Sequence, residues 1–207
     1  MRTAITSGEI PPNEPLRANA LAERWGISAT PIREAFQRLA ADGFLVYSSH
    51  RGVRVAPMSA EELDELIDLR SVVEPLALRR SLERADDRWR SEVQMEWEVL
   101  HAAYEATPFD RASYEAVHHD FHAQLSANAG PTWWPRISLL LRDQAARYRA
   151  VDVQHRDLEL VMAEHDSIVH SCMNGDIESA VMTLERHIAA TKQALQARLR
   201  ERAEVDG

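Results

Sequence analysis

The sequence predicts a mainly α-helical protein, in which an N-terminal winged helix-turn-helix is followed by an all-α antiparallel helical bundle. Two short helical patterns meet at Gly26, and two β-rich runs then flank a polar turn near residues 48–52. This order of elements is typical of a winged helix. Beyond Ser59, apolar residues recur at helical spacing and no segment has the pattern of a strand.

The second of the two short helices begins after Ser28 and ends before Gly43. Ser28 is a suitable N-cap, Pro31 lies near the helix start, where a missing N–H costs little, and Gly43 is a typical residue just beyond a helix end. One face of this helix is apolar and carries Ile32, Ala35, Phe36 and Leu39. A helix of this kind enters the major groove of DNA by its N-terminal end.

Candidate DNA contacts lie on the polar face of this helix and at the tip of the wing. We expect Arg33 to read a base, and Arg38 to lie nearer the phosphates or to pair with Asp42 on the same helix. Arg51 in the wing would contact the phosphates of any sequence. The predicted DNA-binding residues are Ser28, Thr30, Arg33, Gln37, Arg38, His50, Arg51 and Gly52. The alternative is an ordinary helical hairpin followed by a hairpin of strands.

Charge is distributed unevenly along the chain. The net charge of −9 is unexpected for a protein that binds DNA. Residues 1–57, however, carry seven arginines against five acidic residues, a balance of +2, so the remainder carries −11. The N-terminal part can therefore approach phosphates while the acidic part stays away from them.

Composition also bears on where the protein works. No apolar run reaches transmembrane length, and the N-terminus lacks the pattern of a signal peptide. Cys172 is the single cysteine, so no internal disulfide can form, which fits a reducing compartment. We therefore expect a cytoplasmic protein with no membrane partner.

The boundary between two domains is predicted at residues 56–59, which gives domains of residues 1–57 and 58–207. Pro57 breaks the last strand, and Ser59 with Glu62 forms a capping box that opens a new helix. Six amphipathic helices are expected, at 60–84, 86–105, 109–128, 132–151, 156–173 and 176–202. Short links between them imply an antiparallel bundle.

Charged residues also occur near the apolar stripes of these helices. Arg70 and Glu74 are spaced i,i+4 beside the stripe of the first helix, which predicts a partly buried ion pair. Ile137 of the fourth helix is expected to point inward. Most of the four arginines of that helix are expected to be solvated, with one or two facing a cavity: Arg136, Arg142, Arg147 and Arg149.

Four histidines lie on the apolar faces of three predicted helices. His118 and His122 are one turn apart on the third helix, His165 is on the fifth and His187 is on the last. An i,i+4 histidine pair can chelate one ion, and imidazole suits Zn²⁺ or Ni²⁺. A divalent metal site is therefore one interpretation, and a polar pocket without metal is the other.

Several motifs of the N-terminal part recur together in a known family: Ser28–Ala35, Arg38–Leu39, Gly43–Leu45 and Arg51–Val53. They resemble the winged helix of the GntR family of bacterial transcriptional regulators, over about residues 5–55. This chain departs from the family at Ala29, where arginine is usual, and near Ala18, where an acidic residue is usual. The family's first helix is nearly absent from the sequence.

Motifs of the second part carry a further resemblance: Arg70–Ala77, Asp120–Leu125, Glu164–Ile168 and Glu185–His187. They resemble the FCD effector domain of the FadR-type branch of that family. In metal-binding members the ligands are one aspartate and three histidines. The resemblance places the histidines at His122, His165 and His187, with His118 at the position of the aspartate and Asp120 as the other candidate for the fourth ligand.

The resemblance implies a ligand-responsive transcriptional regulator that binds double-stranded operator DNA as a homodimer. Its effector would be a small organic acid whose carboxylate binds the metal and Arg70 or Arg142. One alternative is a regulator for which the ion itself is the signal. Another is a metal-dependent enzyme, which we do not expect, because no general base has a recognisable motif and the winged helix would be unexplained.

Overall fold

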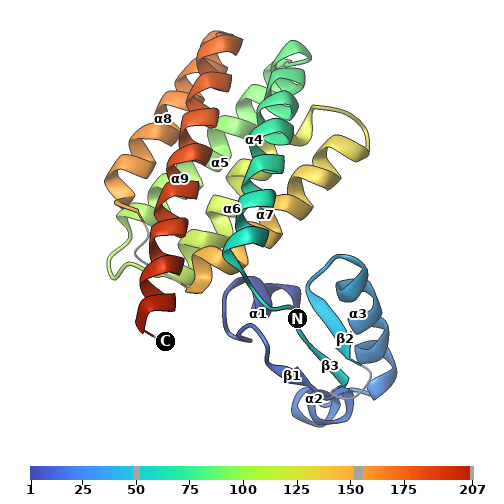
Figure 1. Ribbon diagram of the computed structural model, residues 1–207. Coiled ribbons are helices and arrows are strands. Elements are labelled where there is room, and N and C mark those ends of the chain that lie inside the picture. The colour runs from blue at the N-terminus through green and yellow to red at the C-terminus, as the bar shows by residue number, and fades with distance from the viewer. Residues whose placement is uncertain (49–51, 152–155, 206–207) are drawn as a thin grey trace.

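The computed structural model describes residues 1–48, 52–151 and 156–205 of the chain, and shows a small N-terminal winged helix beside a larger helical bundle (Figure 1). The helices of the first part are α1 (Arg2–Thr6), α2 (Ala18–Trp25) and α3 (Ala29–Ala41). Its strands are β1 (Pro15–Leu16), β2 (Leu45–Ser48) and β3 (Gly52–Val55), in the order β1-β3-β2, and both strand pairs are antiparallel. The predicted winged helix-turn-helix is confirmed.

The glycines of the helix-turn-helix act as the sequence predicts. Gly26 and Gly43 have φ angles of 65° and 82°, in the left-handed region that an L-residue rarely adopts. Ser28 occupies the N-cap position of α3, but its side chain makes no capping hydrogen bond. The small core beneath α3 contains Ile5, Ile32, Phe36, Leu39, Phe44, Leu45 and Val55.

Two elements of the winged helix were not predicted. The first helix is present as α1, whose Ile5 is 3% exposed and joins the core under α3. β1 has two residues, and Leu16 pairs with Val53 of β3. Elements this short have no periodicity of their own, and they form here because the rest of the domain covers them.

The second part is a bundle of long helices, as predicted. Their bounds are α4 (Ala60–Glu83), α5 (Asp87–Glu105), α6 (Arg111–Ala127), α7 (Trp133–Val151), α8 (Leu158–Asn174) and α9 (Ile177–Val205). Ser59 caps α4 by accepting a hydrogen bond from the Glu62 N–H at 3.0 Å. Among the residues described, no strand follows Val55, and no helix has the length and apolar character needed to cross a bilayer.

Helix α7 differs from the prediction because other elements cover it on several sides. It packs on α4, α6 and α1, so Arg142, Arg147 and Arg149 are all buried, whereas solvation was expected for most of its arginines. Arg147 donates hydrogen bonds to the backbone oxygens of the linker residues Ala56 and Pro57, at 2.6 and 3.0 Å. Ile137 lies on the uncovered side and is 41% exposed, so its predicted inward position was wrong.

Polar contacts connect the winged helix to α7. Arg2 of α1 forms ion pairs with Asp42, at the end of α3, and with Asp143 of α7 at 2.8 Å. The side-chain amide of Gln144 donates to the backbone oxygen of Asp42 at 2.6 Å. Asp42 pairs with Arg2, and Arg38 lies 3.6 Å from Glu34, so the alternative of an Arg38–Asp42 pair is not seen.

Candidate metal centre

Four buried histidines meet inside the bundle. His118 and His122 come from α6, His165 from α8 and His187 from α9, and each is at most 7% exposed. Each offers one ring nitrogen, and these four nitrogens all lie within 4.8 Å of one another. Asp120 is not among them: its side chain is 66% exposed and contacts His119. The packing of the helices therefore brings together the four histidines named from the sequence.

The spacing of the nitrogens suits a metal ion. The Nε2 atom of His122 lies 3.1 Å from the Nε2 atoms of both His118 and His165. A neutral imidazole has one N–H and one lone pair, so three Nε2 atoms cannot all satisfy one another by hydrogen bonds. Two nitrogens bound to one tetrahedral zinc ion lie about 3.3–3.4 Å apart, given Zn–N distances near 2.0–2.1 Å. The donor set and its spacing thus fit an ion.

Burial keeps these histidines in the form that binds metals. It lowers the pKa of His118 to about 4 and lowers the pKa values of His122 and His165 well below the ordinary range. Burial also lowers the pKa of His187, although Glu164 opposes this shift. At pH 7 the four rings are therefore neutral and can donate lone pairs.

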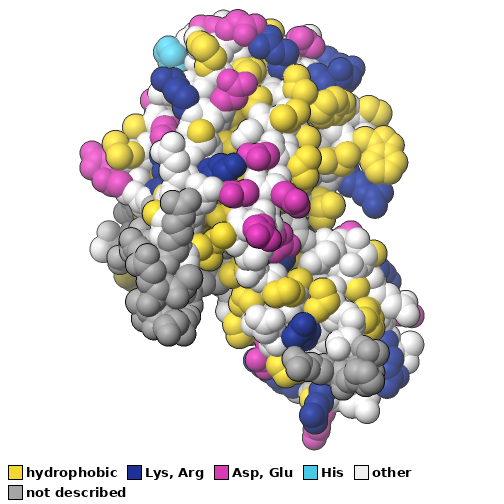
Figure 2. Space-filling model, in the orientation of Figure 1, with side chains coloured by type: hydrophobic (Ala, Val, Ile, Leu, Met, Phe, Trp, Pro, Cys, Tyr) yellow, Lys and Arg dark blue, Asp and Glu magenta, His cyan; other side chains and the backbone are white. Residues whose placement is uncertain are grey.

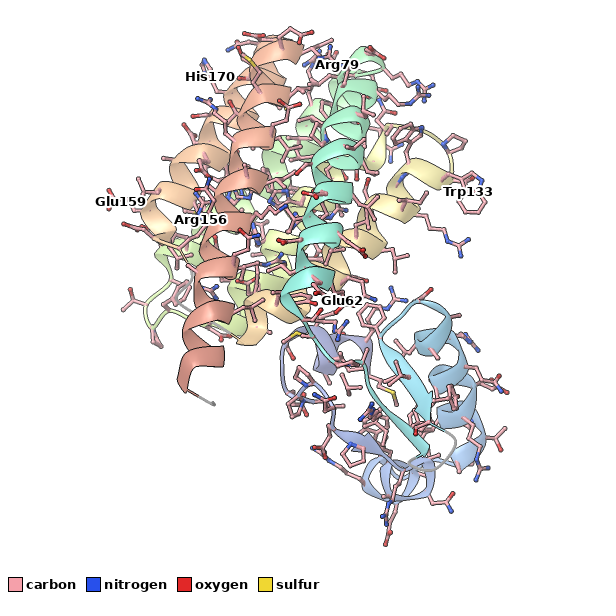
Figure 3. All side chains as sticks on the ribbon, viewed as in Figure 1. Glu62, Arg79, Trp133, Arg156, Glu159 and His170 are labelled. Atoms are coloured by element: carbon pink, nitrogen blue, oxygen red, sulfur yellow. The ribbon has the colours of Figure 1, made fainter. Side chains whose placement is uncertain are left out.

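A cavity of about 30 Å³ borders the histidines and has arginines in its wall. Arg70 of α4 pairs with Glu74 at 2.6 Å, which confirms the expected ion pair, although both groups are fully rather than partly buried. Arg142 of α7 is 3% exposed, and its nearest carboxylate among the described residues is Glu74, at 4.0 Å. Arg156 lies beside α9 at mid-height of the bundle (Figure 3). The cavity therefore combines imidazoles with guanidinium groups.

The candidate DNA-binding residues that the structure describes lie on the winged helix, away from this centre. The exposed positions are Ser28, Thr30, Arg33, Gln37, Arg38 and Gly52. Two further candidates, His50 and Arg51, lie outside the described residues. Arg33 donates to the side-chain oxygen of Asn19 in α2 at 3.2 Å, and Arg17 lies in the same shallow depression. Asn19 and Arg17 were not named from the sequence as candidate DNA contacts, although both lie at the start of the first short helix.

The chain matches two family models. Residues 1–55 match "Bacterial regulatory proteins, gntR family", and residues 65–190 match "FCD domain". The FCD match alone covers more than half of the chain.

Named relatives agree with these matches. The HTH-type transcriptional repressor GlaR of Escherichia coli is 26% identical over 195 residues, covering 91% of this chain and 89% of the relative. A probable D-xylose utilization operon transcriptional repressor of Paenarthrobacter nicotinovorans is 30% identical over 186 residues, covering 90% and 81%. Both are named as transcriptional repressors, which gives no support to the enzyme alternative.

Solved structures share the fold. Escherichia coli McbR/YncC has a TM-score of 0.79 at 20% identity, covering 98% of this chain and 94% of that one. A putative GntR regulator from Rhodococcus sp. RHA1 has a TM-score of 0.80 at 22% identity, covering 94% and 92%. With the family matches to both of its parts, this chain belongs to the GntR family of bacterial transcriptional regulators and carries an FCD domain.

Proposed function

We propose that the chain is a ligand-responsive regulator that senses a small organic acid through a metal-containing pocket. Residues 1–57 would bind double-stranded operator DNA in the cytoplasm, and residues 58–207 would hold the metal, bind the effector and form a homodimer. The observation that carries this proposal is the buried cluster of His118, His122, His165 and His187 beside an arginine-lined cavity.

The four histidines would hold a divalent ion, with zinc or nickel the best match for an all-imidazole set. When bound, the ion supplies an electrophilic site for a carboxylate oxygen. The chain itself supplies neutral nitrogen donors and a dry surrounding, because all four rings are buried. Loss of any one ring would leave an incomplete donor set.

Arg142 and Arg70 would attract the acidic group of the effector. Burial lowers the pKa of Arg142 to about 10, so the guanidinium remains charged at pH 7. Its Nε atom, like Nη1 of Arg70, is buried without a hydrogen-bond partner among the described residues. A buried guanidinium nitrogen without a hydrogen-bond partner is costly, and an anion in the cavity would remove that cost.

An effector would act by binding one arrangement of the DNA-binding heads more tightly than another. A single winged helix reads one half-site, so a symmetric dimer on a palindromic operator would provide the affinity. The bundle offers a face for this dimer: α4 and α7 pack against each other and expose a group of large apolar side chains, namely Leu69, Val72, Leu76, Trp133 and Ile137. Figure 2 shows apolar side chains gathered on this side of the bundle.

The test of the metal centre is replacement of one ligand. We expect wild-type protein, purified without chelator, to carry zinc or nickel in stoichiometric amount by elemental analysis, and His165→Ala to lose it while still binding DNA. His170→Ala is the matched control, because His170 is exposed on the same helix. Stoichiometric metal in His165→Ala, or none in wild type even after titration, would show that the cluster is a polar pocket.

The cavity of about 30 Å³ is small for an organic effector, which favours a second candidate function in which the ion itself is the signal. The two can be separated by measuring operator affinity with and without metal, in the absence and presence of carboxylic acids. A metal-dependent affinity that no acid changes would support the metal sensor.

A further inference from the structure

We propose that Glu164 is a positioning residue for the metal centre and acts through His187. This inference rests on the proposed metal site. Glu164 comes from α8, next in sequence to His165, and its Oε2 atom lies 2.7 Å from the Nδ1 atom of His187 on α9. The carboxylate therefore occupies the Nδ1 atom of His187 and leaves Nε2 as the nitrogen available to a metal.

This contact sets which nitrogen of His187 is available. A carboxylate can only accept a hydrogen bond, so the proton of the neutral ring lies on Nδ1. The lone pair is then on Nε2. The ring of His187 lies 4.7 Å from the ring of His165 and 5.3 Å from that of His122, measured between centroids. The carboxylate thus selects the tautomer and the ring orientation that metal binding needs.

Glu164 is itself held in place. Its second oxygen, Oε1, accepts a hydrogen bond from Nη2 of Arg156 at 2.6 Å. Arg156 lines the cavity and also lies 3.4 Å from the hydroxyl of Thr191, one turn beyond His187 on α9. Both carboxylate oxygens are therefore engaged, and the carboxylate has little freedom to turn away from the ring.

A weaker version of the arrangement exists at another ligand. Glu115 lies 3.8 Å from the Nδ1 atom of His118, and its oxygens pair with Arg111 at 2.7 Å and Arg149 at 3.3 Å. The distance to His118 exceeds that of a normal hydrogen bond. The geometry therefore ranks Glu164 above Glu115 in its effect on the metal.

The experiment is a zinc titration of the full-length protein in competition with a chromophoric chelator. Second-sphere carboxylates typically change metal affinity by about 10–100-fold, and we expect Glu164→Ala to weaken zinc binding by that amount. Glu164→Gln keeps an oxygen that can accept a hydrogen bond from Nδ1–H of His187, so this variant should lose less zinc affinity than Glu164→Ala. Glu115→Ala should also lose less zinc affinity than Glu164→Ala. Asp166→Ala is the matched control, since Asp166 is exposed on the same helix, and it should bind zinc like wild type.

A second readout separates positioning from a general loss of structure. With Co²⁺ in place of zinc, Glu164→Ala should show an altered d–d absorption spectrum, while circular dichroism shows an unchanged helix content. If Glu164→Ala does not fold, Glu164→Gln tests the inference instead, and it should bind zinc more weakly than Asp166→Ala. Wild-type affinity in the folded Ala variant, or in the Gln variant if only that one folds, overturns the inference. Absence of zinc binding by wild type overturns the metal site itself, and with it this inference.

Discussion

The buried histidines make the stability of the metal-free protein depend on pH. Their pKa values are lowered in the folded protein, to about 4 for His118, whereas an unfolded histidine titrates near 6.5. Between these values the unfolded chain binds more protons than the folded one. Stability is therefore fully present above about pH 6.5 and is lost as the pH falls toward 4.

We expect the melting temperature in excess chelator to fall steadily between pH 7.0 and pH 5.0. In this window the contribution of Glu115 and Glu164 to stability is nearly constant, because their pKa values are lowered in the folded protein and that contribution is lost only as the pH falls below the ordinary value of 4.5. Thermal unfolding followed by circular dichroism at several pH values is the measurement. His118→Gln should show a shallower decline, and a flat profile in wild type would contradict the neutral, buried state of the rings.

At the scale of the element, α3 presents a polar face whose residues differ in their neighbours. Arg33 is exposed near the start of the helix and donates to Asn19 of α2, so its position is supported from the preceding helix. Arg38 lies one to two turns later and pairs loosely with Glu34. These surroundings predict different roles for the two arginines in binding DNA.

We expect Arg33→Ala to weaken binding to the operator by about 1–3 kcal/mol and to relax sequence preference, if Arg33 reads a guanine. Arg38→Ala should weaken binding to operator and to unrelated DNA alike, and reduce the dependence on salt. Fluorescence anisotropy with both DNAs at several salt concentrations measures each effect. Operator affinity equal to wild type in Arg33→Ala would mean that another face of α3 reads the bases.

At the scale of the whole molecule, the exposed face of α4 and α7 predicts how two copies associate. Val72 is 59% exposed and Leu69 is 55% exposed, and both lie on one side of α4. We expect wild type to be a dimer at micromolar concentration and Val72→Asp to be largely monomeric by light scattering, because a charge at an apolar interface is costly. Leu160→Asp is the control, since Leu160 is equally exposed on α8. A dimeric Val72→Asp would place the interface elsewhere.

The contact between the winged helix and the bundle also makes a prediction at this scale. Arg2 of α1 forms ion pairs with both Asp42, at the end of α3, and Asp143 of α7. Replacing Arg2 removes both of these ion pairs. We expect Arg2→Ala to speed limited proteolysis within the linker at residues 56–59. Arg24→Ala should not, because Arg24 is exposed and its ion pair among the described residues is with the exposed Glu9 of the winged helix, at 3.7 Å. Equal cleavage rates would mean that the remaining contacts, from Gln144 to Asp42 and from Arg147 to the linker, hold the two parts together without Arg2.

Much of this protein follows from local patterns in the sequence. The helices of the bundle were predictable because each buries a stripe at its own 3.6-residue period. Helix α3 was predictable because Gly26, Ser28 and Gly43 lie close to its ends in the sequence. The four histidines could be named for the same reason, since each stands on the apolar stripe of its helix.

Only the tertiary structure decided which of these side chains meet. His165 and His187 lie on different helices, and so do Glu164 and His187, so their contact depends on how the helices pack and not on spacing along the chain. The same holds for Arg142, Arg147 and Arg149, whose helix has an ordinary polar pattern but is covered by α4, α6 and α1. α1 and β1 are too short to have a pattern and are stabilised by contacts with distant segments. Local patterns therefore determined the elements other than α1 and β1, together with the candidate ligands. Packing between elements decided the burial, the partners and the protonation of the groups at the site.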